Sequence, residues 1–177
     1  MAWTPPKTFV ALEVLTASEL NTYVRDNALF LSTPPSARVY NDADIGISHN
    51  TLTALTFNSE RWDTDEIHST VSNTGRLTCK TAGLHGIYGH IRFAPNVSGS
   101  RIISIRLNGT DVIAHQRVSA IPASGDETSI SIYTEYVLAV NDYVELLVFH
   151  NSGTTLSVTY TAKYSPEFGM TYLGKVS

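Results

Sequence analysis

Three acidic side chains close together are the residues most able to bind a metal ion. Asp63, Asp65 and Glu66 lie within four consecutive positions, and carboxylate oxygens of this kind suit Ca²⁺. A hydrated acidic loop has the same pattern, and we prefer this second interpretation because no further ligands can be assigned. Ca²⁺ is therefore the only cofactor for which the sequence offers a candidate site.

The histidines and the single cysteine form no recognisable catalytic motif. His85 and His90 are five residues apart, so on one strand they point to opposite faces and cannot share a metal ion. Cys79 would need a histidine beside it in the fold to act as a nucleophile, and we expect a small buried hydrophobic residue instead. The sequence has neither a hydrolase signature nor a phosphate-binding glycine loop. We therefore predict that the protein is not an enzyme.

Aromatic side chains are the remaining candidates for ligand recognition. Tyr40, Trp62 and Tyr133 are of the type that stacks on sugars. The same residues are equally suited to fill an interface between subunits or to pack under loops, and we favour these structural roles. The sequence therefore identifies no receptor-binding or other ligand-binding residues.

The composition is that of a folded protein with one ordinary domain and a short extension. Hydrophobic residues make up 42% and charged residues 16% of the 177 residues, enough for a sizeable core. The net charge of −4 offers no basic field to nucleic acid. No apolar run reaches the roughly 20 residues of a membrane-spanning helix, and the first residues lack the features of a signal peptide. We expect neither a nucleic-acid partner nor membrane insertion.

A single helix is predicted before the chain turns to β-structure. Thr16 and Glu19 have the spacing of a capping box, which satisfies the free N–H groups at a helix start. The helix should run over about 17–31 and end before Pro34 and Pro35, because proline cannot continue it. We therefore divide the chain into an N-terminal attachment segment, 1–36, and a head domain, 37–177.

One side of this helix has the spacing of a coiled coil. Its residues follow a 4-3-4 pattern, namely Leu20, Val24, Asn27 and Leu31. About two heptads are too few to be stable alone in water. The helix either packs on its own domain or associates with a partner, and we favour the partner.

The region after residue 36 is predicted to be a β-sandwich. The ranges 86–93, 101–107 and 128–138 alternate apolar and polar residues, as half-buried strands do. Asn108-Gly109 after the second of these is a strong hairpin signal. Eight to ten short strands at regular spacing, without a second helix, indicate an all-β sandwich.

One predicted strand is apolar on both faces. In the range 143–150 the residues Val144, Leu146 and Val148 alternate with a second apolar set, so both faces need a cover. Either a loop of the same chain supplies the cover, or a neighbouring subunit does. We favour a subunit interface, formed by Tyr143, Leu147 and Phe149.

The β region resembles the head domains of the complement-one-q and tumour-necrosis-factor superfamily. The similarity is carried by four runs in the expected order: Thr74-Gly75-Arg76-Leu77-Thr78-Cys79, Ala82-Gly83-Leu84-His85-Gly86-Ile87-Tyr88, Asn141-Asp142-Tyr143-Val144-Glu145-Leu146 and Phe168-Gly169-Met170-Thr171-Tyr172-Leu173. Leu77 and Asn141 stand where the family usually has Phe and Gly, and no collagen-like repeat precedes the head. The resemblance implies a ten-stranded jelly roll that forms a homotrimer.

The N-terminal segment resembles leaders of phage tail-associated and other virion proteins. The similarity lies in the runs that start at Trp3 and Glu13, and those leaders often have Gly where this chain has Leu12. It implies a bacteriophage virion protein, made in the host cytoplasm and joined to other virion proteins through this segment. A trimeric fibre or tail-tip head that attaches to a host-surface glycan or protein is our first interpretation. A capsid or tail decoration protein is the alternative, ahead of a carbohydrate-active enzyme.

Overall fold

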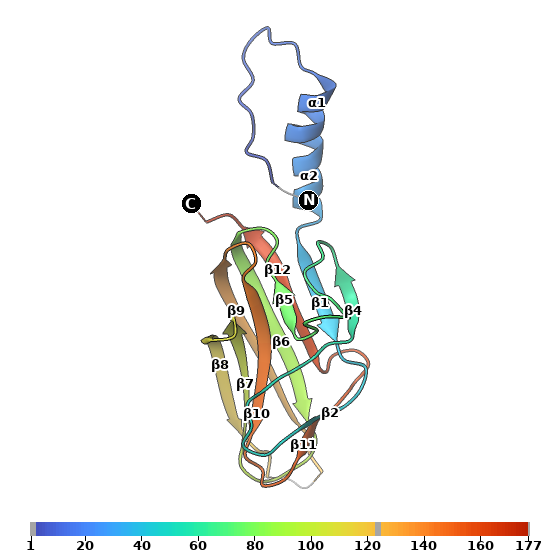
Figure 1. Cartoon of the computed structure of the whole chain (residues 1–177), viewed down its shortest axis with the longest axis vertical. Coiled ribbons are helices and arrows are strands. Elements are labelled where there is room, and N and C mark those ends of the chain that lie inside the picture. Colours follow the sequence, from blue (N-terminus) through green and yellow to red (C-terminus); the bar gives the residue numbers. More distant parts are fainter. Residues whose placement is uncertain (1–2, 123–124, 177) are drawn as a thin grey trace.

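The computed structural model describes residues 3–122 and 125–176 of the chain. Twelve strands in this part form two antiparallel sheets, one of seven strands and one of five. The sheets lie face to face in an elongated head, and a helical extension projects from one end of it (Figure 1). The predicted jelly-roll sandwich with an N-terminal helix is confirmed, with four strands of only two or three residues raising the number of strands above ten.

The first sheet contains the strands that join the head to the N-terminal extension. Its order is β2-β11-β6-β12-β1-β4, with β9 paired along the whole opposite edge of β6. The bounds are β1 (Ser36–Tyr40), β2 (Ile45–Ile47), β4 (Ser59–Asp63), β6 (Gly83–Phe93), β9 (Thr128–Leu138), β11 (Leu156–Val158) and β12 (Glu167–Gly174). The long strands β6 and β12 lie inside the sheet, β9 forms an edge beside β6, and β1 follows the helix.

The second sheet is built around β10. Its order is β3-β10-β7-β8, with β5 also paired to β10. The bounds are β3 (Thr53–Ala54), β5 (Arg76–Thr78), β7 (Ser100–Leu107), β8 (Asp111–Ser119) and β10 (Tyr143–His150). Asn108 and Gly109, with φ angles of 48° and 75°, have the left-handed backbone of a tight hairpin turn that joins the paired residues Leu107 and Asp111. The predicted hairpin between β7 and β8 is therefore confirmed.

Alternating residues of both sheets fill the space between them. On β9, Ile130 and Ile132 point inward and are buried. Tyr136 belongs to the same face of the strand by alternation, but 39% of its surface remains exposed. The rings of Phe57 and Phe168 stack with centroids 5.8 Å apart. Each fully buried side chain of this size stabilises the fold by about 2 kcal/mol, so the sandwich is held mainly by this shared core.

The helix is continuous but changes its winding in the middle. Helix α1 (Ala17–Leu20) passes into a π-helical segment, η1 (Asn21–Asp26), and then into α2 (Asn27–Ser32). The capping box at Thr16 and Glu19 is present, with both reciprocal hydrogen bonds. The predicted helix is thereby confirmed to within one residue at its end. Residues 3–15 have no helix and run alongside the helix of residues 17–32, so the extension is a hairpin with one irregular arm and one helical arm (Figure 1). It is named the N-terminal hairpin below.

Candidate interaction surfaces

The outer face of the first sheet carries two tyrosine rings that lie flat on the backbone. A Cβ atom at Gly169 would lie 2.1 Å from the Tyr88 ring, and one at Gly86 would lie 3.1 Å from the Tyr133 hydroxyl. Tyr88 and Tyr133 are opposite each other on β6 and β9. Glycine at both positions therefore lets the tyrosines cover the sheet, and Tyr133 remains 60% exposed. This flat aromatic face is named the tyrosine face below.

A polar depression borders the tyrosine face. It has a volume of about 470 Å³ and is lined by Arg38, Tyr88, His90, Ser129, Tyr164 and Glu167. The buried carboxylate of Glu167 forms ion pairs with Arg38 and Arg61. Burial lowers the pKa of His90, and Arg38 lowers it further, against the opposing effect of Glu167. The depression is thus a charge-balanced surface next to exposed aromatic rings.

The second sheet also has a carboxylate that joins two arginines. Glu145 on β10 is 7% exposed and lies 2.8 Å from Arg106 and 3.4 Å from Arg76. The Arg76 guanidinium also stacks 4.0 Å from the centre of the Tyr143 ring. These contacts cover part of the outer face of β10 with side chains of the same chain.

The subunit interface predicted at Tyr143, Leu147 and Phe149 stays a prediction, and the single chain already covers one of its three residues. Leu147 is 1% exposed in the isolated chain, and the other two are half-buried. The alternative, cover by the same chain, is what the structure shows for Leu147. Strand β3 pairs with β10 at Leu147 and β5 pairs with it at Tyr143, and strand alternation alone does not reveal either pairing.

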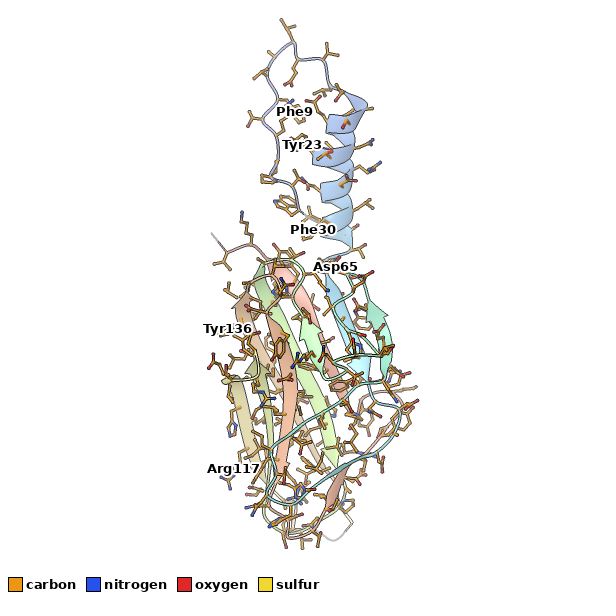
Figure 2. The ribbon with its side chains drawn as sticks, viewed as in Figure 1. Phe9, Tyr23, Phe30, Asp65, Arg117 and Tyr136 are labelled. Carbon is orange, nitrogen blue, oxygen red and sulfur yellow. The ribbon has the colours of Figure 1, made fainter. Side chains whose placement is uncertain are left out.

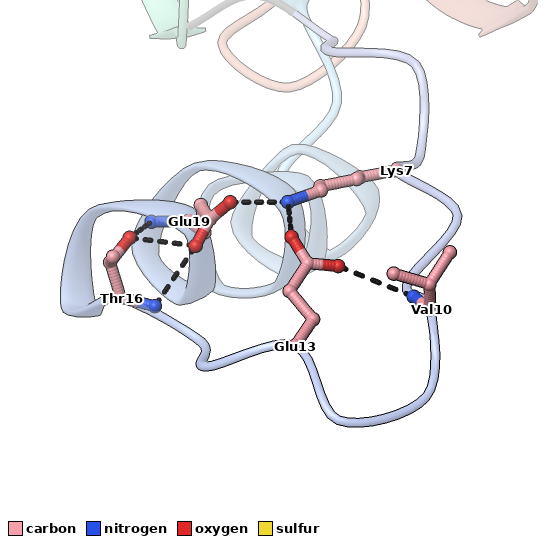
Figure 3. Close-up of polar contacts among 5 residues, drawn as sticks. All are labelled: Lys7, Val10, Glu13, Thr16 and Glu19. Atoms are coloured by element: carbon pink, nitrogen blue, oxygen red, sulfur yellow. Dashed lines mark hydrogen bonds and ion pairs between the residues drawn. The ribbon is translucent and has the colours of Figure 1, made fainter.

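A network of ion pairs and hydrogen bonds among Lys7, Glu13, Thr16 and Glu19, named the polar clasp below, joins the two arms of the N-terminal hairpin. The Lys7 ammonium donates to the carboxylates of both Glu13 and Glu19. Glu19 also accepts hydrogen bonds from the Thr16 backbone and hydroxyl at 2.9 and 2.8 Å, and Glu13 accepts from the Val10 N–H (Figure 3). The hydrogen bond from Lys7, followed by those from Thr16, lowers the pKa of Glu19 to about 2. The clasp therefore stays ionised at physiological pH.

An aromatic chain joins the hairpin to the head. Phe30, which is 3% exposed, contacts Trp3 at 6.1 Å and Tyr172 at 5.3 Å between ring centroids. Tyr172 packs in turn on His85, 5.5 Å away inside the sandwich. Phe30 lies at the base of the helix (Figure 2). The coiled-coil pattern missed this residue, although a large aromatic residue just before Pro34 was a usable signal.

Asn27 does not belong to the exposed side of the helix, contrary to the predicted attachment face. Its amide exchanges two hydrogen bonds with the Thr4 backbone, at 3.1 and 2.8 Å. The hydrogen bonds of the π-helical segment span five residues instead of four, so each turn holds more residues and the 4-3-4 spacing loses its register. The other three predicted positions remain exposed, namely Leu20, Val24 and Leu31.

The surface of the hairpin is apolar and has no unpaired charge among its described residues. Its five charged residues all form ion pairs inside the hairpin, Lys7 with Glu13 and Glu19, and Arg25 with Asp26. Nine large apolar side chains are nevertheless exposed, namely Phe9, Val10, Leu12, Val14, Leu15, Leu20, Val24, Leu29 and Leu31. A patch of this kind typically marks a contact surface.

Leu12 lies at the tip of the hairpin in an unusual conformation. Its φ angle is 66°, in the left-handed region that costs a residue with a Cβ about 1 kcal/mol. Glycine adopts this conformation freely. Glycine at this position would therefore remove the conformational cost that Leu12 carries.

Among the described residues, Asp63, Asp65 and Glu66 are not grouped in the arrangement of a metal site. The Asp63 carboxylate accepts hydrogen bonds from the backbone N–H groups of Asp65 and Ile67, both at 3.0 Å, and of His68 at 2.7 Å. Within residues 3–122 and 125–176, no group of three or more His, Cys, Asp or Glu side chains is arranged to hold a metal ion. Asp63 instead orders its own loop.

The fold does place a histidine beside the single cysteine. Cys79 Sγ lies 3.8 Å from His85 Nε2, and both side chains are buried. Burial raises the pKa of the Cys79 thiol to about 11 and lowers the pKa of His85. A thiolate–imidazolium pair is therefore disfavoured, and the two residues form part of the core, as expected for Cys79.

Comparison with known proteins identifies the fold but no sequence family. No protein-family model matches the sequence, and no curated protein matches it. Solved structures do match. The Eiger TNF of S. frugiperda has 15% sequence identity and a TM-score of 0.59, and the match covers 81% of this chain and 96% of that one. Murine APRIL has 10% identity and a TM-score of 0.57, with coverage of 78% and 98%, and the globular domain of zebrafish complement 1qA has 14% identity and a TM-score of 0.55, with coverage of 80% and 99%.

The chain therefore has the jelly-roll fold of tumour-necrosis-factor and complement 1q head domains. The similarity covers about four fifths of this chain, a share close to that of the head alone. None of the described helices is long and apolar enough to span a lipid bilayer.

Proposed function

We propose that the protein is a non-enzymatic structural component of a bacteriophage virion, a homotrimeric head that is attached to the particle through its N-terminal hairpin. The observation that carries this proposal is the hairpin surface, with nine exposed large apolar side chains and every described charge paired internally. The phage-like leader sequence in the same segment supports the virion setting.

The tyrosine face is the proposed interface between the three subunits. Self-association is what the sequence resemblance to the complement and tumour-necrosis-factor heads implies. Tyr133 and Val137, both on β9, are 60% and 54% exposed. Their side chains bury apolar area only if another molecule covers the first sheet, and aromatic side chains are enriched at such interfaces.

The hairpin is the proposed contact with other virion proteins. It projects from the end of the head where β1 begins, so its apolar tip is the most distant part of the chain from the opposite loops (Figure 1). Each apolar side chain buried in full contributes about 1.5–3 kcal/mol. Burial of a few tip residues is therefore sufficient for a stable attachment, and three subunits multiply the effect. The far end of the head would then face outward, toward the host.

Particle binding tests the proposal. Purified particles of the phage or prophage whose genome carries this sequence should contain the protein by mass spectrometry. Particles that lack it should bind the added recombinant protein and co-sediment with it. Val14→Glu, which places a charge on an 85% exposed tip residue, should abolish co-sedimentation. Val71→Glu is the matched control, because Val71 is 91% exposed on the head, and it should bind as wild type does.

The same experiment separates the two virion roles. An attachment head should also bind host cells, and this binding should survive Val14→Glu because the hairpin is not involved. A decoration protein should bind particles but not cells. Absence of the protein from purified particles, or equal co-sedimentation of the Val14→Glu and Val71→Glu variants, would refute the proposed attachment through the hairpin.

A further inference from the structure

A shallow polar depression lies on the second sheet, near the end of the head opposite the hairpin. It has a volume of about 440 Å³ and is lined by Gly99, Ser100, Arg117, Val118, Ser119 and Asn151. These residues come from the start of β7, the end of β8 and the loop after β10. Figure 2 shows Arg117 in this lower part of the head. None of the lining residues is acidic.

A chain of hydrogen bonds fixes the side chains at the rim. Arg117 Nε donates to Ser100 Oγ at 3.1 Å, and Ser100 Oγ donates to Asn151 Oδ1 at 3.2 Å. The Ser100 N–H donates to the same Asn151 oxygen at 2.6 Å. Because Oδ1 already accepts hydrogen bonds from Ser100, the amide of Asn151 has a defined orientation. Its NH₂ group is still available as a hydrogen-bond donor.

The depression therefore presents hydrogen-bond donors. Among the described residues, the terminal guanidinium nitrogens of Arg117, the Asn151 NH₂ group and the Ser119 hydroxyl have no protein partner. Arg117 also forms no ion pair with any described residue. An arginine fork beside amide and hydroxyl donors matches the oxygens of a tetrahedral anion.

A second positive charge lies next to the depression. Arg101 is fully buried, and its guanidinium donates only to uncharged acceptors on Asn96, Ser98 and Ser100. No carboxylate in the described part of the chain neutralises it, and its Nε has no hydrogen-bond partner. A buried uncompensated charge acts through a medium that screens it poorly, so Arg101 increases the positive potential around Ser100.

The backbone at this place is adapted to the arrangement. Gly99 has a φ angle of 76°, and a Cβ atom there would lie 2.4 Å from Asn151 Oδ1. Any other residue would thus be strained and would displace the amide that orients Arg117 and Ser100. Ser100 and Ser119 are paired opposite each other across β7 and β8, which brings the walls of the depression together.

From this geometry we infer that the depression is a binding site for a phosphate or sulfate group, held by Arg117, Asn151 and Ser119. The group is either a free anion or an ester on a surface polysaccharide. The site lies within one chain, so it does not depend on the proposed trimer or on attachment through the hairpin. If the proposed virion role is correct, the site faces away from the particle, where a host glycan would be met.

Titration of the ¹⁵N-labelled full-length protein with inorganic phosphate tests the inference. Chloride at matched ionic strength is the reference, and the chemical shifts of Gly99, Ser119 and Asn151 are followed. Saturable shifts confined to this region are expected. Arg117→Gln should weaken phosphate binding at least tenfold. Arg25→Gln is the matched control, because it removes the same charge from the distant hairpin, and it should leave the affinity unchanged.

Two results would overturn the site: shifts with phosphate that equal those with chloride, or an Arg117→Gln variant that binds phosphate as wild type does. Glucose 6-phosphate and glucose identify the source of the group. Tighter binding of the ester than of phosphate, without binding of glucose, supports a sugar-borne phosphate. Equal binding of the ester and phosphate supports a free anion at the same site. Neither titration measures oligomeric state or particle binding. A failure of the anion site can therefore be told apart from a failure of the proposed trimer or of attachment through the hairpin.

Discussion

Replacement of Tyr133 by glutamate is the most direct test of the tyrosine face as the subunit interface. Tyr133 is 60% exposed, and its hydroxyl donates to Glu135 on the same strand at 2.9 Å. The side chain contributes little to the core of the single chain. We therefore expect Tyr133→Glu to leave the monomer folded and to act on the association of subunits.

The magnitude follows from the area that the interface would cover. An aromatic side chain can bury about 200 Å², so the 60% of Tyr133 that is exposed corresponds to about 120 Å², or about 3 kcal/mol at 25 cal/mol per Å². The polar hydroxyl reduces this to about 2 kcal/mol. A buried, unpaired carboxylate adds a penalty of several kcal/mol. A loss of at least about 4 kcal/mol per interface weakens association about 1000-fold.

Light scattering coupled to size exclusion measures the outcome. The wild-type protein should have three times the chain mass of 19.4 kDa, and Tyr133→Glu should have the mass of a monomer at micromolar concentration. Val112→Glu is the control, because Val112 is 53% exposed on the edge strand β8 of the other sheet, and it should remain trimeric.

Phe149→Asp distinguishes the tyrosine face from the interface predicted by the sequence pattern. If the second sheet formed the contact, Phe149→Asp would dissociate the trimer and Tyr133→Glu would not. That result would refute the assignment to the tyrosine face. A wild-type protein that is monomeric at all concentrations would instead refute the homotrimer itself.

Three further perturbations test separate parts of the structure. Glu145→Gln should lower the free energy of unfolding in urea by about 2 kcal/mol, because it leaves two arginines unpaired that are themselves partly exposed; an unchanged midpoint would show that water replaces the ion pairs. Phe30→Ala should increase amide exchange in the hairpin while the head keeps its melting temperature, since Phe30 joins the two through Tyr172; equal loss of protection in both parts would contradict this. Burial lowers the pKa of His85 and His150, so below pH 6.5 the unfolded chain binds protons more readily than the folded chain. The free energy of unfolding should therefore decrease as the pH is lowered, by up to about 1.4 kcal/mol per pH unit for each histidine. An unfolding free energy that stays constant from pH 7 to pH 5 would refute this.

The elements of the head were predictable because strand signals are local. The alternation in 128–138 and the turn at Asn108-Gly109 depend only on neighbouring residues and on backbone sterics. The capping box at Thr16 and Glu19 is equally local. These features, together with the order of the family-like runs, were sufficient for the sandwich and the helix.

The surfaces were not predictable to the same degree. Strand alternation shows that both faces of β10 are apolar, but not that Leu147, which pairs with Ala54 on β3, is buried within the single chain. The coiled-coil spacing assumed regular α-helix, whereas the π-helical segment turns Asn27 toward Thr4. In both cases the deciding contact joins residues that are far apart in the sequence.

By itself, the sequence determined the fold class, the position of the helix and the absence of a catalytic motif, because hydrophobic period, capping and turn residues act over a few positions. Only the tertiary structure decided which side chains lie together. It placed Tyr133 over Gly86, oriented Asn151 toward Ser100 and buried Arg101 with no carboxylate partner among the described residues. Such arrangements arise from pairing between distant strands, and the interaction surfaces of this protein follow from that pairing.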